Sequence, residues 1–216
     1  KKLQKRAHKN FLFTNKYSSN LIDTLRSSLI TKKININFNK NKKLKILYIT
    51  NFNERFNGRL HYNTGKRIYN GLIKLGHNVF SISDRDIISN YKSLVDPSGK
   101  NILNYKIIES CRNFNPDTII MGHADNVKKE TLDYLKNKNK NLKISQWFLD
   151  PITKLGPDYE NNKNRLLKCE EFIDASFITT DPKSIDFNVN NSYFIPNPAD
   201  ESFETLKNYE ENPEND

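Results

Sequence analysis

The chain has 216 residues, a net charge of +10 and a hydrophobic fraction of 36%. This length suffices for one sizeable core, or for one domain with extensions. The apolar residues occur in compact blocks, which excludes global disorder. Because no apolar run reaches about 18 residues and none lies near the start, we expect neither a membrane span nor a signal peptide. We therefore expect a cytoplasmic protein whose two cysteines, Cys111 and Cys169, are reduced packing residues.

The charge is distributed unevenly along the chain. Residues 1–45 carry +12, residues 46–199 carry +4 and residues 200–216 carry −6. A protein that binds nucleic acid spreads its basic surface over the domain that grips the phosphates. We therefore expect no specific nucleic-acid partner.

The basic segment at residues 1–43 is expected to be partly helical. Leu21, Leu25 and Leu29 recur at helical spacing, and residues 34–38 alternate like a short strand. Basic amphipathic segments favour acidic lipid interfaces, so one hypothesis places this segment on an anionic membrane surface, at the inner face of the membrane. The alternative is a helix that packs on the domain with solvated lysines.

A regular alternation of short strands and helices follows the basic segment. Near-continuous apolar runs such as residues 119–121 are typical of strands buried on both faces. The expected strands cover residues 44–50, 78–83, 118–121, 142–148, 175–180 and 192–195. The expected helices cover residues 64–75, with Thr64 as the cap and Gly76 after the end, 102–114, 128–136 and 166–172. This order predicts an α/β fold with a Rossmann-like parallel sheet and helices on both faces, over residues 44–200.

Open parallel sheets bind ligands beyond the carboxyl ends of their strands, so the loops at those ends are the candidate sites. These loops cover residues 51–63, 84–86, 122–126, 150–153, 181–183 and 197–200. No His, Cys and Asp trio has the spacing of metal ligands, so we expect no metal site.

The loop at residues 51–63 is long, polar and leads into a helix. Free amides at a helix start favour a phosphate or carboxylate, and Arg59 offers a bidentate grip. We expect Asn57, Gly58, Arg59 and His61 to bind substrate or phosphate. The loop lacks the G-x-G-x-x-G pattern, so NAD and FAD are excluded. The alternative is a mobile surface loop, although loops this long are often functional.

Gly122, His123 and Asp125 follow a buried strand directly. His123 is a candidate general base or sugar ligand, with Asp125 to orient it and Gly122 to let backbone approach a ligand. The alternative is a capping loop in which Asp125 or Asn126 starts the next helix.

Trp147 lies near the end of the next strand, close to Asp150. Aromatic faces stack on sugar rings, and a carboxylate binds hydroxyls. We count Asp150 with His123 and Asp125 as catalytic candidates and Trp147 as a substrate contact. The competing interpretation is a core tryptophan, with Asp150 capping a turn before Pro151.

Several motifs together resemble the first half of bacterial GT-B glycosyltransferases. The strand KILYI at residues 45–49 and LIKLGHNV at residues 72–79 are similar to the opening of that family. PDTII at residues 116–120 resembles its strand entry "PDvii". DASFITTD at residues 174–181 and FIPNPAD at residues 194–200 are similar to its end-of-domain pattern. The resemblance covers roughly residues 44–203.

The resemblance implies two Rossmann-like domains that face each other across a cleft. The first binds the sugar acceptor, and the second binds the nucleotide sugar. It implies acceptor or catalytic contacts for His123 and Asp125, and a place facing the donor phosphates for Gly58 and Arg59. The glycine pair usual in the family is reduced here to Gly58.

By the same resemblance, Asp150 and Asn197 line the cleft. The function implied is a glycosyltransferase that moves sugar from a nucleotide-sugar donor to a cell-surface glycan or another acceptor, without a cofactor. We expect the enzyme to be incomplete without a C-terminal donor-binding domain, with residues 201–216 as an acidic tail or the start of a linker. The alternatives are a non-catalytic flavodoxin-like binding module and a polyanion-binding accessory protein.

Overall fold

The structure is a computed structural model that describes residues 42–203. Residues 43–203 form one compact unit, close to the domain expected at residues 44–200. The hypotheses on the basic segment concern residues that lie almost wholly outside the described range, as do those on the acidic tail. None of the helices within residues 42–203 is long and apolar enough to cross a membrane.

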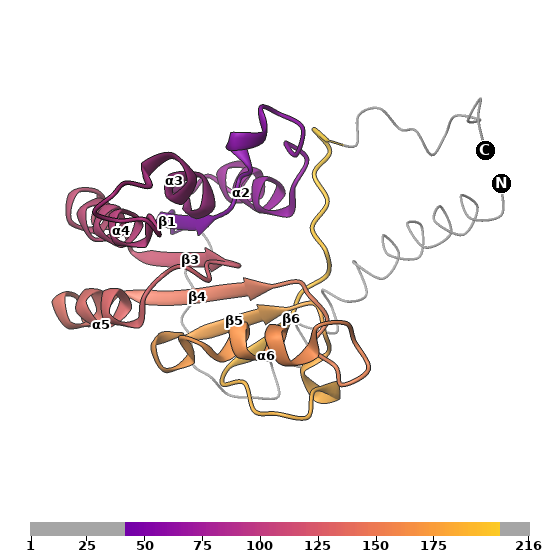
Figure 1. Ribbon diagram of the computed structural model, residues 1–216. Coiled ribbons are helices and arrows are strands. Elements are labelled where there is room, and N and C mark those ends of the chain that lie inside the picture. Colours follow the sequence, from indigo (N-terminus) through magenta and orange to yellow (C-terminus); the bar gives the residue numbers. More distant parts are fainter. Residues whose placement is uncertain (1–41, 204–216) are drawn as a thin grey trace. The chain divides into compact units, whose positions relative to one another are not determined.

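Six parallel strands form one sheet, which confirms the predicted α/β fold (Figure 1). The strands are β1 (Lys45–Thr50), β2 (Asn78–Ser83), β3 (Thr118–Gly122), β4 (Lys143–Phe148), β5 (Ala175–Ile178) and β6 (Ser192–Phe194). Their order in the sheet is β2-β1-β3-β4-β5-β6. The chain moves from β1 to one side for β2, and returns past β1 for β3. The sheet therefore has a topological switch point between β1 and β3, where ligands of open parallel sheets bind.

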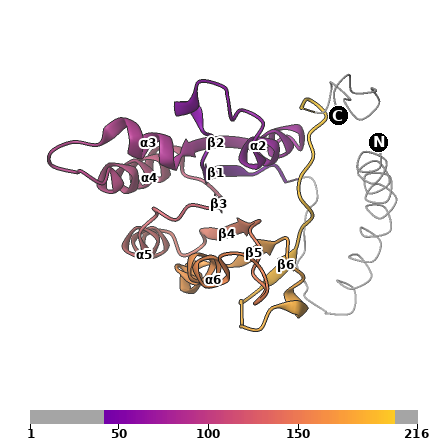
Figure 2. The same ribbon diagram turned by 45° about the vertical axis from the view of Figure 1, so that its right-hand side comes forward.

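Helices connect the strands and cover both faces of the sheet. The α-helices are α2 (Thr64–Lys74), α3 (Asp84–Tyr91), α4 (Lys100–Phe114), α5 (Lys129–Lys138) and α6 (Tyr159–Leu167). The short 3-10 turns are η1 (Glu54–Phe56), η2 (Glu170–Phe172) and η3 (Pro182–Ser184). Turned views show α2 on one side of the sheet and α3, α4 and α5 on the other (Figure 2).

Strand β1 is buried on both faces, as its continuous apolar sequence predicts. Ile46 and Tyr48 point into a cluster with α2, whereas Leu47 and Ile49 point into the larger cluster under α4 and α5. All four side chains are at most 1% exposed. Because successive side chains of a strand alternate in direction, one six-residue strand anchors two helical layers.

The ends of α2 follow helix-capping chemistry. The side chain of Asn63 accepts a hydrogen bond from the Lys66 amide at 2.9 Å, so Asn63 is the N-cap and the expected cap at Thr64 was wrong by one residue. Gly76 follows the helix with φ of 81°, as expected for a left-handed terminator.

Two helices differ from expectation. Residues 84–86 were expected in a loop, but they form the first turn of α3, a helix of eight residues that was not predicted. Its only aliphatic residues are Ile87 and Ile88, too few to show a helical period. The helix expected at residues 166–172 lies mostly earlier, as α6, which ends at Leu167, and the rest of that range holds the short turn η2.

The segment after β6 returns across the domain to α2 (Figure 1). Asp200 is 5% exposed and pairs with Lys74 on α2, with 3.1 Å between Oδ1 and Nζ. Hydrogen bonds from Ser202 hold the pKa of the Asp200 carboxyl below its ordinary value. The return places Asn197 beside the loops at the carboxyl edge of the sheet.

Candidate functional site

An open cavity of about 500 Å³ lies at the carboxyl edge of the sheet. Its walls combine the end of β1, the start of α2 and the loops after β3 and β4, so it occupies the switch point. The predicted site residues that it brings together are His123, Trp147, Asp150 and Asn197. The residues added by the structure are Thr50, Asn51, Asn63, Thr64, Gly65, Arg85, Leu149 and Arg165.

Arg165 on α6 is the centre of the charged cluster at this cavity. Its Nη1 lies 2.9 Å from Asp150 Oδ2, and its Nε and Nη2 lie 3.2 and 3.1 Å from the two oxygens of Asp125. Its guanidinium also lies over the Phe148 ring, 5.3 Å from the centroid. Burial alone would lower the pKa of Arg165, but bonds to Asp125 and Asp150 raise it, so the guanidinium is a permanent charge.

Asp125 is held from two sides. Arg165 contacts both carboxylate oxygens, and Arg85 Nη2 lies 3.1 Å from Oδ2. No hydrogen bond joins this carboxylate to the ring of His123 within residues 42–203. The orienting role predicted for Asp125 is therefore not seen, because two arginines engage the carboxylate instead.

His123 lies in a left-handed backbone conformation, with φ of 49°, and its ring is wedged among aromatic side chains. The ring stacks on Phe148 at 4.6 Å between centroids and meets Trp147 edge-on at 5.2 Å. Burial lowers the pKa of His123 below its ordinary value, and Asp150 offsets part of this effect. The imidazole is therefore neutral at neutral pH.

Both ring nitrogens of His123 face N–H donors. The Leu149 amide donates to Nε2 at 3.3 Å, and Arg165 Nη2 lies 2.9 Å from Nδ1. A neutral imidazole has one acceptor nitrogen, so it satisfies only one donor. Asp150 Oδ2 lies 3.6 Å from Nδ1. Asp150 is therefore the carboxylate beside the ring.

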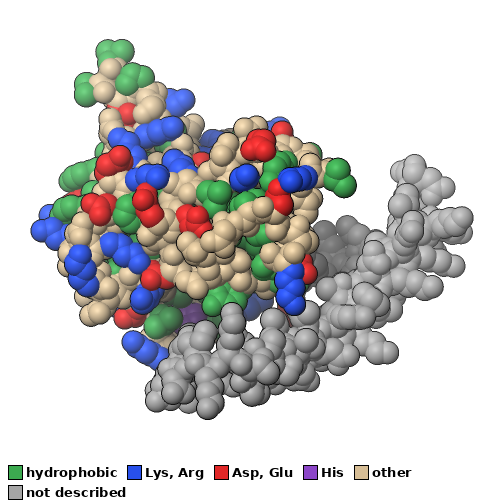
Figure 3. Space-filling view, turned by 90° about the horizontal axis from the view of Figure 1, so that it is seen from below, with side chains coloured by type: hydrophobic (Ala, Val, Ile, Leu, Met, Phe, Trp, Pro, Cys, Tyr) green, Lys and Arg blue, Asp and Glu red, His purple; other side chains and the backbone are tan. Residues whose placement is uncertain are grey.

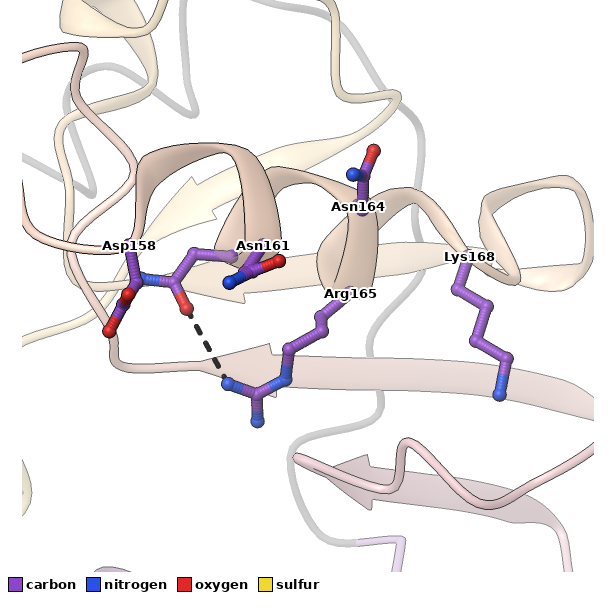
Figure 4. A pocket seen from close by; sticks show the side chains of 6 residues that line it. Asp158, Asn161, Asn164, Arg165 and Lys168 are labelled. Atoms are coloured by element: carbon purple, nitrogen blue, oxygen red, sulfur yellow. Dashed lines mark hydrogen bonds between the residues drawn. The ribbon is translucent and has the colours of Figure 1, made fainter.

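A second open cavity, of about 620 Å³, lies along α6 (Figure 4). Arg165 and Lys168 extend from the same side of the helix, whereas Asn164 extends from the other side (Figure 4). Asn162 Oδ1 lies 3.5 Å from Arg165 Nη1. Arg165 lines both cavities, so one guanidinium belongs to both surfaces.

Asp84 adds a buried carboxyl group near the cluster. The residue is 0% exposed, and among residues 42–203 neither carboxylate oxygen has a hydrogen-bond partner with acceptable geometry. Burial raises the pKa of Asp84 to about 6, while Arg85 and Asn126 limit the rise. This group changes its charge closer to neutral pH than an ordinary carboxyl does.

Trp147 belongs to the core and to the cavity wall. It is 5% exposed, and its indole N–H donates to the Tyr48 hydroxyl at 3.1 Å, which in turn donates to the Gly65 carbonyl at 3.1 Å. A Cβ on Gly122 would lie 2.0 Å from the indole ring. Gly122 was expected to admit a ligand, but it makes room for the tryptophan.

The first part of the loop after β1 is tied down by Asp86 of α3. This carboxylate accepts hydrogen bonds from the amides of Glu54 and Arg55, at 2.9 and 3.2 Å, and pairs with the Arg55 guanidinium at 2.8 Å. Burial alone would raise the pKa of Asp86, but these bonds and the one from Ser83 lower it. This part of the loop is therefore a fixed wall.

The remaining predicted loop residues do not line the cavity. Asn57 is the left-handed C-cap of η1, and the Arg59 guanidinium lies over the Phe56 ring at 5.4 Å. His61 packs edge-on against Phe203 at 5.4 Å. The cations at the cavity are Arg85 and Arg165 instead. Arg85 lies in the candidate loop at residues 84–86, but the pairing of either arginine with Asp125 was not expected from the sequence, because Asp125 is 40 positions away in both cases.

A scan against protein-family models matches no family, and no curated protein is significantly similar to the chain.

Proposed function

We propose that this chain is the acceptor-binding half of a two-domain glycosyltransferase, and that the cavity at the switch point holds the sugar acceptor. The observation that carries the proposal is the composition of the cavity wall. Side-chain amides and hydroxyls, a carboxylate and an imidazole face the same open space, with an indole and Leu149 beside them. Sugars present the matching combination of hydroxyl groups and apolar C–H faces.

Among the three catalytic candidates, Asp150 is better placed than His123 and Asp125 to act as the base for the acceptor hydroxyl. Its side chain is 43% exposed, and its Oδ1 accepts no hydrogen bond from any residue between 42 and 203. The bound hydroxyl donates to this carboxylate, which takes the proton as the hydroxyl oxygen bonds to the anomeric carbon of the donor and the bond from that carbon to the diphosphate oxygen breaks. Arg165 fixes the other oxygen, and His123 adds a neutral polar contact. The leaving diphosphate is stabilised by groups outside this domain.

Saturation-transfer NMR on the full chain with a panel of glycosides tests this assignment. We expect at least one glycoside to bind, and Asp150→Asn to weaken it about tenfold, the effect of losing one hydrogen bond to a charged group. Asp181→Asn is the control, since Asp181 caps η3 and does not line the cavity. Failure of every glycoside to bind, or tight binding of a sugar nucleotide to this chain alone, would contradict the acceptor-side assignment.

The strand order favours a second candidate, a non-catalytic flavodoxin-like binding module. The sheet contains the doubly wound order β2-β1-β3-β4-β5, the order in which flavodoxin binds flavin mononucleotide at the switch point between β1 and β3. Titration with flavin mononucleotide, followed by quenching of flavin fluorescence, separates the two candidates. If the quenching is saturable and a glycoside does not reverse it, the result supports the flavodoxin-like binding module.

A further inference from the structure

Two aliphatic side chains lie in solvent on the connection between α3 and α4. Leu94 is 101% exposed and Val95 is 93% exposed, and we call this pair the aliphatic tip. The connection projects away from the sheet (Figure 2), and the space-filling view shows hydrophobic side chains at the end of a protrusion with basic side chains near its base (Figure 3). Single exposed apolar residues are common, but an adjacent pair on a projection marks a contact surface.

The backbone on either side of the aliphatic tip is fixed by hydrogen bonds. The Ser93 amide donates to the Asp96 carbonyl at 3.1 Å, and the Asp96 amide donates to Ser93 Oγ at 3.0 Å. The Asp96 carboxylate then accepts from the amides of Asn101 and Ile102, at 2.8 and 3.1 Å, and so caps α4. Because the backbone of the turn is already fixed, binding through its two outward-facing apolar side chains costs little further conformational entropy.

The surroundings of the aliphatic tip are aromatic and basic. Tyr91 and Tyr105 are 50% and 59% exposed, and Lys106 Nζ lies 4.4 Å from the centre of the Tyr91 ring. Lys92 and Lys100 flank the turn in sequence, are exposed, and form no ion pair within the part of the chain that the structure describes. The carboxylate of the turn is buried and engaged in capping, so the exposed charge here is positive.

We propose that the α3–α4 connection is a membrane-binding loop that inserts the aliphatic tip into the interface of an anionic lipid bilayer. Aliphatic side chains gain from transfer into the acyl boundary, tyrosines prefer the headgroup level, and lysines are attracted to acidic headgroups. A hydrophobic pocket on a protein would accept the tip, but it would not need unpaired lysines around it. The inference is independent of the ligand cavity and of the function proposed for it.

Leu94→Trp in the full chain gives a direct test with lipid vesicles. We expect its emission, after subtraction of the Trp147 emission of the parent chain, to shift to the blue with vesicles of phosphatidylcholine and phosphatidylglycerol. With phosphatidylcholine alone the shift should be much smaller. Leu155→Trp is the matched control, because Leu155 is also 101% exposed but lies in another loop, and its emission should stay unchanged.

A partition measurement separates this loop from the basic segment, which can bind the same vesicles by charge. Replacing both residues of the tip by serine should lower the partition coefficient by about 100-fold, because burial of each of the two aliphatic side chains is worth about tenfold or more. Leu155→Ser should leave it unchanged. Three outcomes would overturn the proposal. The first is binding to vesicles without a blue shift of the tryptophan at position 94. The second is a blue shift that grows with protein concentration in the absence of lipid, and the third is the absence of a shift with lipid while position 94 photo-crosslinks to a protein.

Discussion

Arg165 joins three groups that lie far apart in the sequence. It contacts Asp125, Asp150 and the ring of His123, so its positive charge opposes protonation of that ring while the two carboxylates favour it. The protonation state of the His123 imidazole therefore depends on α6, the helix that carries Arg165.

Replacing Arg165 by glutamine should raise the pKa of His123, because Asp150 and Asp125 then act on the ring without an opposing charge. The free energy of unfolding should fall by about 1 to 2 kcal/mol, a figure reduced for the partial exposure of all three charges. NMR titration of the imidazole measures the first effect, and urea denaturation measures the second. Lys163→Gln on the same helix is the control. If it raised the pKa of His123 as much as Arg165→Gln does, the effect would not come from the local contact between Arg165 and the ring.

Two aspartates of α3 should affect stability with opposite signs. The folded pKa of Asp84 is raised from 3.8 to about 6, so this group costs stability as the pH rises through that interval. Asp84→Asn should exceed the parent in free energy of unfolding by about 1 to 3 kcal/mol above pH 6, with the gap closing towards pH 3.8.

Asp86 provides the comparison for this pH dependence. Its folded pKa is lowered, so its contribution is present above the ordinary value and is lost as the pH falls. Asp86→Asn should therefore reduce the free energy of unfolding at neutral pH, by about 1 to 3 kcal/mol. Urea denaturation across the pH range measures the free energy of unfolding of both variants. If this free energy changed with pH in the same way in Asp84→Asn and Asp86→Asn, the opposite effects predicted for the two aspartates would be refuted.

At the scale of elements, the packing of β3 against β4 depends on Gly122, whose lack of a side chain leaves room for the Trp147 indole. Gly122→Ala places a methyl group 2.0 Å from the Trp147 indole, so one of the two strands must shift. We expect a loss of about 3 kcal/mol in the free energy of unfolding, the cost of an overpacked core.

Gly71→Ala is the matched control for this substitution. A Cβ on Gly71 would meet no atom of the described part of the chain within 4 Å, and the residue lies inside α2. Alanine should stabilise that helix by about 0.5 to 1 kcal/mol. Denaturation with urea measures both, and a neutral result at position 122 would mean that the indole moves aside easily.

Elements with a strong local pattern could be predicted from the sequence, and those defined by long-range contacts could not. The strands follow from apolar runs, and the end of α2 follows from Gly76. Helix α3 is too short for a readable period. Asp150 and His123 could be placed at the same edge from the parallel order alone, whereas Arg165 could not, since its role depends on where α6 lies over the sheet.

At the scale of the whole molecule, the core clusters on both faces of the sheet belong to one compact unit. Residues 43–203 contain both helical layers and the returning segment that ends beside α2. A fragment with these residues should fold alone and unfold in one urea transition, with the midpoint of the full chain. A fragment without a cooperative transition would show that the remaining residues are needed for folding.

The position of the single tryptophan gives the domain an optical reporter. Trp147 is shielded from water by β1 and α2, yet it contributes to the wall of the open cavity. Its emission therefore responds to the solvent on one side only, while the hydrogen bond to Tyr48 keeps the ring in place. A molecule that enters the cavity replaces water beside the indole, so intrinsic fluorescence follows occupancy without any added label.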